Sequence, residues 1–272
     1  MIEIDRRPYA YRTTHKIEEV DVIESGLRRT LLRKDLRRSH LDPHGLGAKP
    51  EFLDDPRREI AAYTLLADAD LGVPQCIEAG SDWLLLEKVD GVELWQLGEL
   101  HPWKEAARWL ARFHAAFINR PPVGPPFLDY DAAYFAIWPE RARAQHSSVA
   151  RIVEHYDRVV EILMDCPRTF VHGEFYAPNV IIGDHRVAPV DWEMAGVGPA
   201  VLDIAALATG WGVAQRDEIV AAYGLIPTEC LAAAELHFAM QWLGWSADWQ
   251  PPPEHRRDWE AEAFGAAELL GL

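Results

Sequence analysis

A polar segment set among short apolar segments constrains the fold more than any other feature. Residues 172–179 read His-Gly-Glu-Phe-Tyr-Ala-Pro-Asn, and Asp191 follows twelve residues after the last of them. Short apolar segments bounded by Gly, Pro and polar residues are typical of β-strands joined by loops. The pattern therefore predicts a small β unit whose loops carry Glu174, Asn179 and Asp191. The flanking apolar segments are 170–171, 180–182 and 187–190.

The first ninety residues are predicted to form a β-rich lobe. Apolar and polar residues alternate over much of 8–37 around a Ser-Gly turn, which predicts a β-hairpin. Pro56 favours a helix that starts there, because proline is accommodated in the first helical turn, and the apolar run 83–86 predicts another strand. We therefore expect an N-terminal lobe over 1–90 with an antiparallel sheet and one helix, ending at a hinge.

The remaining residues, 91–272, read as a mainly helical lobe. Apolar residues recur at helical spacing over 102–117, and a proline-rich segment at 121–126 ends that helix. The two parts together predict an α+β fold with two lobes. A chain of 272 residues with 49% hydrophobic content can bury a sizeable core. Further helices are expected over 132–165, 200–210, 214–223, 228–246 and 254–270.

Composition argues against several classes of partner and site. The net charge of −16 argues against nucleic-acid binding, which requires a basic surface. The three cysteines, Cys76, Cys166 and Cys230, form no CxxC pair, which argues against a disulfide framework or a structural zinc site. The N-terminus lacks the features of a signal peptide, and no uncharged apolar stretch approaches membrane-spanning length. We expect a cytoplasmic protein with no membrane partner; the sequence does not indicate its oligomeric state.

The segment 172–179 and the run Asp191-Trp192-Glu193 resemble the catalytic core of the aminoglycoside phosphotransferase and choline kinase family. Members of that family are small-molecule relatives of the protein kinases, and their catalytic loop reads H-G-D-x-x-x-x-N, followed by a strand that ends in Asp. The protein-kinase loop H-R-D-L-x-x-x-N has the same spacing between its acid and its Asn. The resemblance covers residues 9–211 and implies a bilobal, protein-kinase-like fold.

The resemblance implies ATP- and Mg²⁺-dependent transfer of the γ-phosphate to a hydroxyl of a small molecule. Phosphoryl transfer depends mostly on positioning and charge neutralisation. Glu174 would accept or orient the proton of the alcohol. Asn179 and Asp191 would bind Mg²⁺ through oxygen atoms, which this cation prefers. Glu174, Asn179 and Asp191 are thus the predicted catalytic residues.

The charge distribution bears on the acceptor. Residues 27–39 hold six basic side chains, whereas 172–272 hold 15 Asp and Glu against 4 Arg. A basic N-terminal segment suits an anionic nucleotide, and an acidic C-terminal half suits a cationic acceptor such as an aminoglycoside, an amino sugar or an amino alcohol. A solvated acidic surface that keeps the protein soluble explains the same pattern equally well.

One position departs from the family pattern. The family has Asp where this chain has Glu174, and the extra methylene moves the carboxylate by more than ~1 Å, a misplacement that can cost on the order of 100-fold in rate. We expect an active enzyme because Lys34, Asn179 and Asp191 are present together. Two alternatives remain: a nucleotide-binding pseudokinase with a regulatory role, and a kinase for Ser or Thr side chains of a peptide in a natural-product pathway.

Upstream residues occur in the order expected of a kinase-like N-terminal lobe. Lys34 lies in a segment that resembles the strand presenting the phosphate-binding Lys, and Glu59 resembles the helical Glu that pairs with it. Thr13 and Thr14 resemble the loop that covers the phosphates, although no G-x-G-x-x-G pattern occurs near them, and an ordinary turn is the alternative.

Two further segments extend the resemblance. Glu87 and Val89 resemble the hinge between lobes, where their backbone groups would bind adenine; the sequence does not distinguish ATP from GTP. Asp203 matches a family Asp that holds the catalytic loop. An acid in the first turn of an apolar helix is a competing explanation for Asp203.

Overall fold

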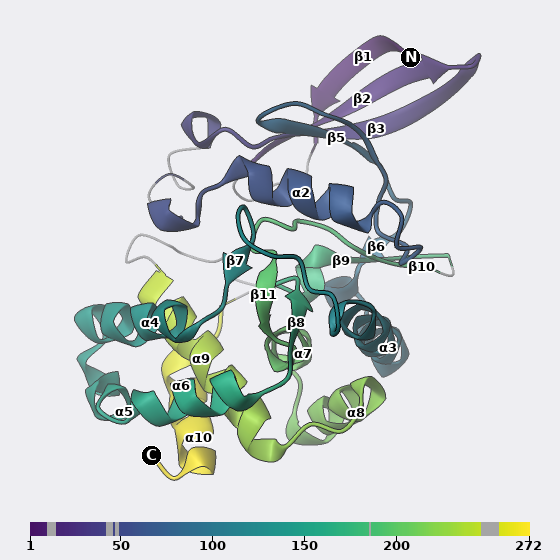
Figure 1. The fold of residues 1–272 in the computed structure, drawn as a ribbon. Coiled ribbons are helices and arrows are strands. Elements are labelled where there is room, and N and C mark those ends of the chain that lie inside the picture. Colours follow the sequence, from purple (N-terminus) through teal and green to yellow (C-terminus); the bar gives the residue numbers. More distant parts are fainter. Residues whose placement is uncertain (10–14, 42–45, 47–48, 185, 246–255) are drawn as a thin grey trace.

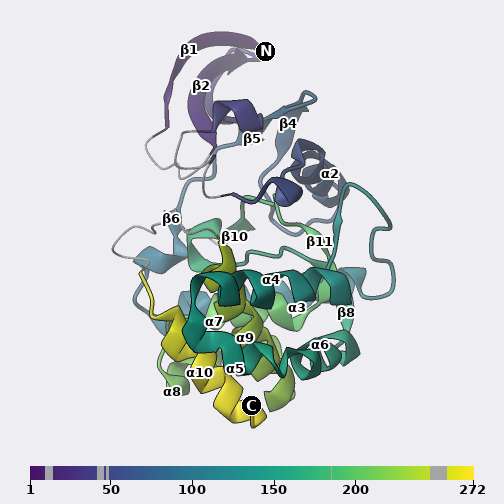
Figure 2. The same cartoon turned by 90° about the vertical axis from the view of Figure 1, so that its left-hand side faces the viewer.

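The computed structural model describes residues 1–9, 15–41, 46, 49–184, 186–245 and 256–272. Within these residues the chain forms two lobes, an N-terminal one built on an antiparallel sheet and a mainly helical C-terminal one (Figure 1). The view turned by 90° shows the same separation, with the C-terminus at the far end of the helical lobe (Figure 2). This arrangement agrees with the α+β, two-lobed fold expected from the sequence.

The N-terminal sheet has five strands in the order β1-β2-β3-β5-β4, and each neighbouring pair is antiparallel. Its central hairpin turns at Ser25 and Gly26, whose φ angles of 51° and 81° are those of a tight turn that matches the twist of the flanking strands. The strands are β1 (Ile2–Pro8), β2 (Lys16–Glu24), β3 (Leu27–Asp35), β4 (Cys76–Ala79) and β5 (Trp83–Glu87).

Side-chain alternation determines which face of this sheet carries Lys34. On β5, Leu85 belongs to a small outer cluster, while Leu84 and Leu86 belong to the main core. Lys34 of β3 lies directly opposite Leu84, and opposed residues of an antiparallel pair share a face of the sheet. Lys34 therefore lies on the inner face, the same face that α2 (Pro56–Leu66) covers.

The helix α2 begins where its sequence predicts. Asp55 is the N-cap and its side chain accepts a hydrogen bond from the Arg57 N–H, while Pro56 occupies the first turn, where no intrahelical N–H is needed. The buried side of α2 carries Tyr63 and also Glu59, which is only 1% exposed. A carboxylate is therefore brought into the interior opposite β3, where it requires a cationic partner.

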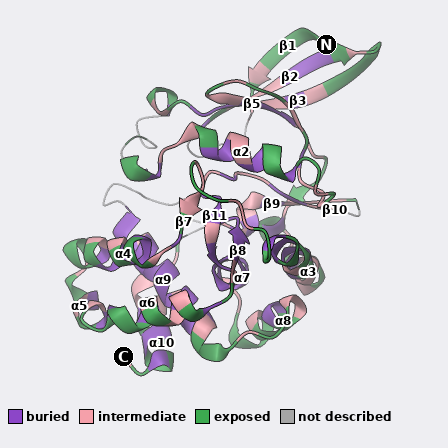
Figure 3. Ribbon diagram, viewed as in Figure 1, coloured by how far each residue is buried: buried purple, intermediate pink, exposed green. Residues whose placement is uncertain are grey.

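The C-terminal lobe is built from eight α-helices within the described residues: α3 (Leu100–Phe117), α4 (Ala132–Gln145), α5 (Ala150–Val153), α6 (Tyr156–Asp165), α7 (Val201–Ala208), α8 (Val213–Tyr223), α9 (Thr228–Trp245) and α10 (Trp259–Leu270). Helix α9 is buried along most of its length and packs against α4, α6, α7 and α10 (Figure 3). Among the helices that the structure describes, none alone has the length and apolar composition of a membrane span; α8 and α9 reach them only together, and they are bent by 112° at their junction.

Two three-stranded sheets place the polar loops on the side of the helical lobe that faces α2. One has the order β10-β9-β6 and the other β7-β11-β8. The loop 172–179 follows β8, and Asp191 follows the β9–β10 hairpin two residues after its end. The strands are β6 (Val92–Glu93), β7 (Leu128–Asp129), β8 (Arg168–Val171), β9 (Val180–Gly183), β10 (Arg186–Pro189) and β11 (Gly196–Pro199).

One expected helix is interrupted. The sequence favours a single helical stretch over 132–165, but the structure divides it into α4, the short α5 and α6. His146, which follows α4, has extended backbone angles, and a turn of 3₁₀-helix over Ser147–Val149 redirects the chain. This redirection lets α4 and α6 both pack against α9.

Candidate active site

The loop 172–179 is held by a carboxylate buried beneath it. Asp203, in the first turn of α7, is fully buried and accepts hydrogen bonds from the backbone N–H of His172 at 2.7 Å and of Gly173 at 2.8 Å. A ring nitrogen of His114, on α3, lies 3.1 Å from the same carboxylate. These contacts confirm the interpretation of Asp203 as the residue that holds this loop.

His172 connects the loop to the strand that precedes Asp191. Its Nε2–H donates to the Val190 carbonyl oxygen at 2.9 Å, and its Nδ1 accepts from the Glu174 N–H at 3.3 Å. One neutral tautomer satisfies both bonds, and burial lowers the pKa of the ring, so that it remains uncharged. His172 thus supports the loop from within.

Two backbone conformations shape the site. Gly173 has a φ of 83°, and a Cβ there would lie 2.1 Å from the Tyr130 hydroxyl and 2.4 Å from the Met194 carbonyl oxygen. Asp191 has a φ of 64°, in the left-handed region that non-glycine residues rarely occupy. Such strained residues concentrate at functional sites, where the surrounding structure holds them in place.

Lys34 joins the two lobes through its ammonium group. The Nζ lies 2.8 Å from Glu59 Oε2 on α2 and 2.7 Å from Asp191 Oδ1 in the helical lobe, and the residue is only 5% exposed. Burial alone would lower the pKa of Lys34, but the carboxylates of Asp191 and Glu59 raise it well above its ordinary value. The side chain is therefore a fixed, fully charged ammonium.

Glu174 and Asn179 lie on the same loop, close to these charges. The Asn179 Nδ2 donates to the Glu174 carbonyl oxygen at 3.0 Å, so its amide oxygen is the atom that can face a cation. Burial, reinforced by the negative charges of Glu193 and Asp191, raises the pKa of the Glu174 carboxyl well above its ordinary value. We refer to Lys34, Lys49, Glu59, Glu174, Asn179, Asp191 and Glu193 together as the polar centre.

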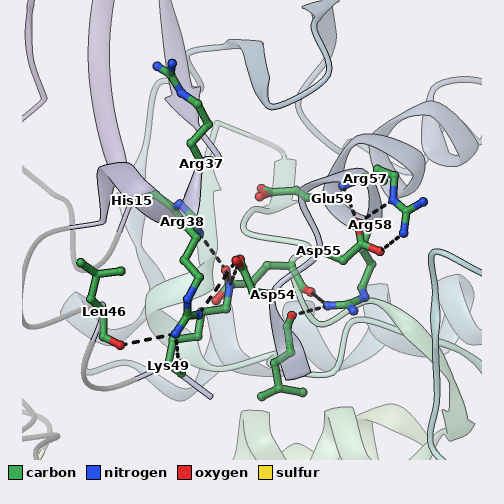
Figure 4. Close-up of polar contacts among 12 residues, drawn as sticks. His15, Arg37, Arg38, Leu46, Lys49, Asp54, Asp55, Arg57, Arg58 and Glu59 are labelled. Atoms are coloured by element: carbon green, nitrogen blue, oxygen red, sulfur yellow. Dashed lines mark hydrogen bonds and ion pairs between the residues drawn. The ribbon is translucent and has the colours of Figure 1, made fainter. Parts of the chain in front are cut away.

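A second cationic group faces Glu193, two residues after Asp191. The Lys49 Nζ lies 2.5 Å from Glu193 Oε2, and the His15 Nε2 lies 3.1 Å from the same oxygen (Figure 4). Burial would raise the pKa of Glu193, but Lys49 and His15 bring it well below its ordinary value. The sequence gives no signal for Lys49, which lies in a segment without periodic pattern and outside the motifs of the resemblance. His15 directly follows Thr13 and Thr14, in the segment that resembles the phosphate-covering loop, but its contact with Glu193 could not be predicted from that segment.

Arg58 connects α2 to the helical lobe beside the polar centre. It is 4% exposed and donates to three carbonyl oxygens: Leu53 at 2.8 Å, Glu193 at 2.7 Å and Pro126 at 3.0 Å. Its neighbour Glu59 was recognised from the sequence. Arg58 itself was not, since an Arg in a helix is ordinarily solvent-exposed.

The predicted nucleotide-binding residues have different outcomes. Thr13 and Thr14 lie outside the described residues. Glu87 is the last residue of β5 and Val89 lies two residues beyond it, but the Glu87 N–H already donates to the Gln75 carbonyl oxygen at 2.8 Å. Its carboxylate forms an ion pair with Arg186 of β10 at 2.7 Å, so Glu87 also connects the end of β5 to the helical lobe. An adenine contact from Glu87 would have to use its carbonyl oxygen.

Comparison with solved structures identifies the fold. A choline kinase from Streptococcus pneumoniae, LicA, superposes with a TM-score of 0.65 at 12% identity, covering 100% of this chain and 94% of the other. A choline kinase from Cryptosporidium parvum gives 0.64 at 15%, covering 98% and 88%. The aminoglycoside phosphotransferase APH(3'')-Id from Streptomyces rimosus, solved with ADP and streptomycin, gives 0.61 at 16%, covering 89% and 93%. These likenesses confirm the protein-kinase-like fold.

Sequence comparison agrees with the fold. No curated protein sequence matches this chain. A family model described as the phosphotransferase enzyme family matches residues 20–256, which include the whole polar centre. The match covers most of the chain and confirms both the predicted resemblance and the predicted class of enzyme. The chain belongs to the phosphotransferase enzyme family.

Proposed function

We propose that this phosphotransferase uses ATP and Mg²⁺ to transfer the γ-phosphoryl group to a hydroxyl of a small molecule that also carries an amino group. The observation that carries the proposal is the joint contact of Lys34 with Glu59 and Asp191, beside the loop that bears Glu174 and Asn179. A fixed ammonium next to carboxylate and amide oxygens is the arrangement that positions a polyphosphate with its metal.

Lys34 and Glu59 have separate parts in this reaction. The ammonium binds phosphate oxygens, while the Glu59 carboxylate holds it in place, which limits the rotamer entropy lost when the nucleotide binds. In the structure Lys34 also contacts Asp191. With a nucleotide bound, Lys34 would contact the phosphates as well, which would leave Asp191 oxygens available to hold a cation.

The residues present fit a magnesium ion. Asp191 offers carboxylate oxygens and Asn179 an amide oxygen whose NH₂ group is already directed to the Glu174 carbonyl, and hard oxygen ligands are those that Mg²⁺ prefers. Asn179 and Asp191 are therefore the proposed ligands. When bound, the ion supplies neutralisation of charge on the phosphates.

Glu174 is the proposed base that accepts or orients the proton of the acceptor hydroxyl. Its burial beside Glu193 and Asp191 raises its pKa, and a carboxylate with a raised pKa is a better proton acceptor near neutral pH. The additional methylene relative to Asp places the carboxylate farther from the loop backbone. We infer that the acceptor binds correspondingly farther from the loop than in relatives that have Asp.

The acceptor class is inferred from charge and from the relatives. The C-terminal segment 172–272 is acidic, with 15 Asp and Glu against 4 Arg, which favours a cationic molecule. The choline kinases and the streptomycin-bound phosphotransferase are named for, or solved with, alcohols that carry a cationic nitrogen group. An amino alcohol, amino sugar or aminoglycoside is therefore the proposed acceptor.

A matched library of hydroxylated compounds tests the proposal. ADP release is measured with ATP and Mg²⁺ for amine-bearing alcohols and for their amine-free counterparts, with Asp191→Ala as the blank. We expect acceptor-dependent ADP release from the amine-bearing set, lost in the blank. Equal ADP release by the Asp191→Ala variant would contradict the metal assignment, and a preference for amine-free alcohols would contradict the acceptor class.

The substitution at position 174 allows a direct test of the pseudokinase alternative. Glu174→Ala removes the carboxylate without touching Lys34, Glu59 or Asp191, so nucleotide binding should persist while phosphoryl transfer falls by on the order of 100-fold or more. Unchanged acceptor-dependent ADP release in this variant would refute the role given to Glu174, and a wild-type protein that binds ATP without any turnover would support the pseudokinase.

A further inference from the structure

Lys49 is a buried cation that no motif of the family resemblance includes. It lies just before α2, is 6% exposed, and contacts Glu193 Oε2 at 2.5 Å. Asp54 is its other acidic neighbour, at 3.9 Å, beyond hydrogen-bond distance. An ammonium has three donor hydrogens. Within the described residues, Glu193 is the one acceptor at hydrogen-bond distance from Lys49, so the group retains capacity to bind further oxygens.

The position of Lys49 within the polar centre differs from that of Lys34. Lys34 lies on strand β3, between the carboxylates of Glu59 and Asp191. Lys49 contacts Glu193, two residues after Asp191, whereas Lys34 contacts Asp191 itself. The two ammonium groups therefore reach the segment 191–193 at different points, Lys34 from β3 and Lys49 from the segment that precedes α2.

This arrangement separates two phosphate-binding positions. The Lys on the central strand of kinase-like folds pairs with the inner phosphates of the nucleotide, whereas the group that is transferred must come to the acceptor hydroxyl at the base. Lys34 is in the first position. Lys49, whose partner Glu193 lies two residues beyond Asp191, is the candidate for the second, where charge on the transferred phosphoryl group has to be stabilised.

We propose that Lys49 is a second phosphate-binding residue, whose ammonium leaves Glu193 to contact the terminal phosphate of a nucleoside triphosphate while Lys34 contacts the inner phosphates. The inference rests on the proposed function and adds to it a residue that distinguishes a triphosphate from a diphosphate. In the structure Glu193 stands in for the phosphate, since a carboxylate and a phosphate offer the ammonium the same kind of anionic oxygen.

A purely structural role for Lys49 makes a different prediction. If Lys49 only neutralised Glu193, its loss would weaken the binding of every nucleotide equally, or would lower stability without changing the preference among nucleotides. If Lys49 contacts the terminal phosphate, its loss weakens binding of a triphosphate and leaves a diphosphate unaffected.

The test compares the dissociation constants of ADP and of a non-hydrolysable ATP analogue, both with Mg²⁺, by isothermal titration calorimetry. In Lys49→Met we expect the affinity for the ATP analogue to fall about tenfold to 100-fold, because that is the contribution of a charge-assisted hydrogen bond. The affinity for ADP should stay within about threefold of the wild-type value, since a change of that size is within the usual variation of such contacts. Lys104→Met is the matched control, because Lys104 pairs with Glu218 at 3.0 Å on the outside of the helical lobe.

Two further variants protect the test against misfolding. Lys49→Met leaves Glu193 without this partner, so the double variant Lys49→Met with Glu193→Gln removes both charges, and its ratio of ADP to analogue affinity should shift as in the single variant. Lys49→Arg keeps the charge and should retain most of the wild-type ratio. Thermal unfolding of each variant identifies those that fold.

The outcomes separate this inference from the function on which it rests. A wild-type protein that binds both nucleotides, with the ratio of affinities unchanged in every folded Lys49 variant, overturns the role of Lys49 alone. A wild-type protein that binds neither nucleotide overturns the proposed function as well. A selective loss of affinity for the analogue, absent in Lys104→Met, supports Lys49 as a phosphate-binding residue.

Discussion

Replacing Asp203 by Asn tests how the loop 172–179 is held. The substitution preserves the size of the side chain but replaces one acceptor oxygen by an NH₂ group. Asp203 now accepts from two backbone N–H groups, those of His172 and Gly173, at 2.7 and 2.8 Å. In the variant one of these donors must face the NH₂ group, where no acceptor is present, and the fully buried site gives it no access to water.

The cost follows from these contacts. A hydrogen bond to a charged group contributes roughly 1.5–3 kcal/mol, and a buried donor left without a partner costs about 1–3 kcal/mol. We therefore expect Asp203→Asn to lower the free energy of unfolding by about 2–4 kcal/mol, a large part of the ~5–15 kcal/mol that a domain has in total. Because the loop carries Glu174, a shift of about 1 Å should also reduce kcat by on the order of 100-fold.

Urea unfolding followed by tryptophan fluorescence, together with kcat on an identified acceptor, measures both effects. Asp217→Asn is the control, since that carboxylate is largely exposed and its pair with Arg216 lies at the surface; its change should remain within about 0.5 kcal/mol. If Asp203→Asn matched this control in stability and the wild type in kcat, the loop would not depend on this carboxylate and the reasoning would be wrong.

Three further predictions concern the same region. The kcat/KM of the enzyme should fall on acidification with a midpoint above 4.5, because the raised pKa of Glu174 means that the active, ionised base is lost at a higher pH than an ordinary Glu; a pH–rate profile checks this. Gly173→Ala should lower the free energy of unfolding by about 3 kcal/mol or more, since the residue has a positive φ and the new Cβ would overlap the Met194 carbonyl oxygen. The control is Gly98→Ala, where a Cβ meets open space, and this variant should unfold at nearly the same urea concentration as the wild type. Glu59→Gln should lower nucleotide affinity about tenfold, because Lys34 is then held less rigidly; calorimetry measures this. An unaltered affinity would contradict the role of Glu59 in holding Lys34.

The sequence predicted the elements whose pattern is local. The hairpin of β2 and β3, the start of α2 at Pro56 and the loop bearing Glu174 each follow from residues close together in the chain. Lys34 and Glu59 were paired by their resemblance to a known order, and the structure brings them together at 2.8 Å. Asp191 completes this group because the β9–β10 hairpin directs it back to the same loop.

Other features were missed because they depend on distant partners. The strand β11 pairs with β8 and β7 from elsewhere in the chain and contains two glycines, so its sequence carries no strand pattern. The role of Lys49 depends on Glu193, more than a hundred positions away in the chain, and Arg58 joins the lobes through the carbonyls of Glu193 and Pro126, which are also distant from it in the sequence. A charged residue whose partner is that distant reads in sequence as an ordinary surface residue.

The three carbonyl contacts of Arg58 bear on how such an enzyme can be controlled. In many kinase-like proteins the helix that carries the paired glutamate swings outward to switch activity off. Here that movement would separate the buried guanidinium of Arg58 from the carbonyl oxygens of Glu193 and Pro126. Leaving these buried groups without hydrogen-bond partners would cost several kcal/mol. Arg58 therefore holds α2, and with it Glu59, against the helical lobe, and an outward movement of this helix is disfavoured as a means of switching the enzyme off.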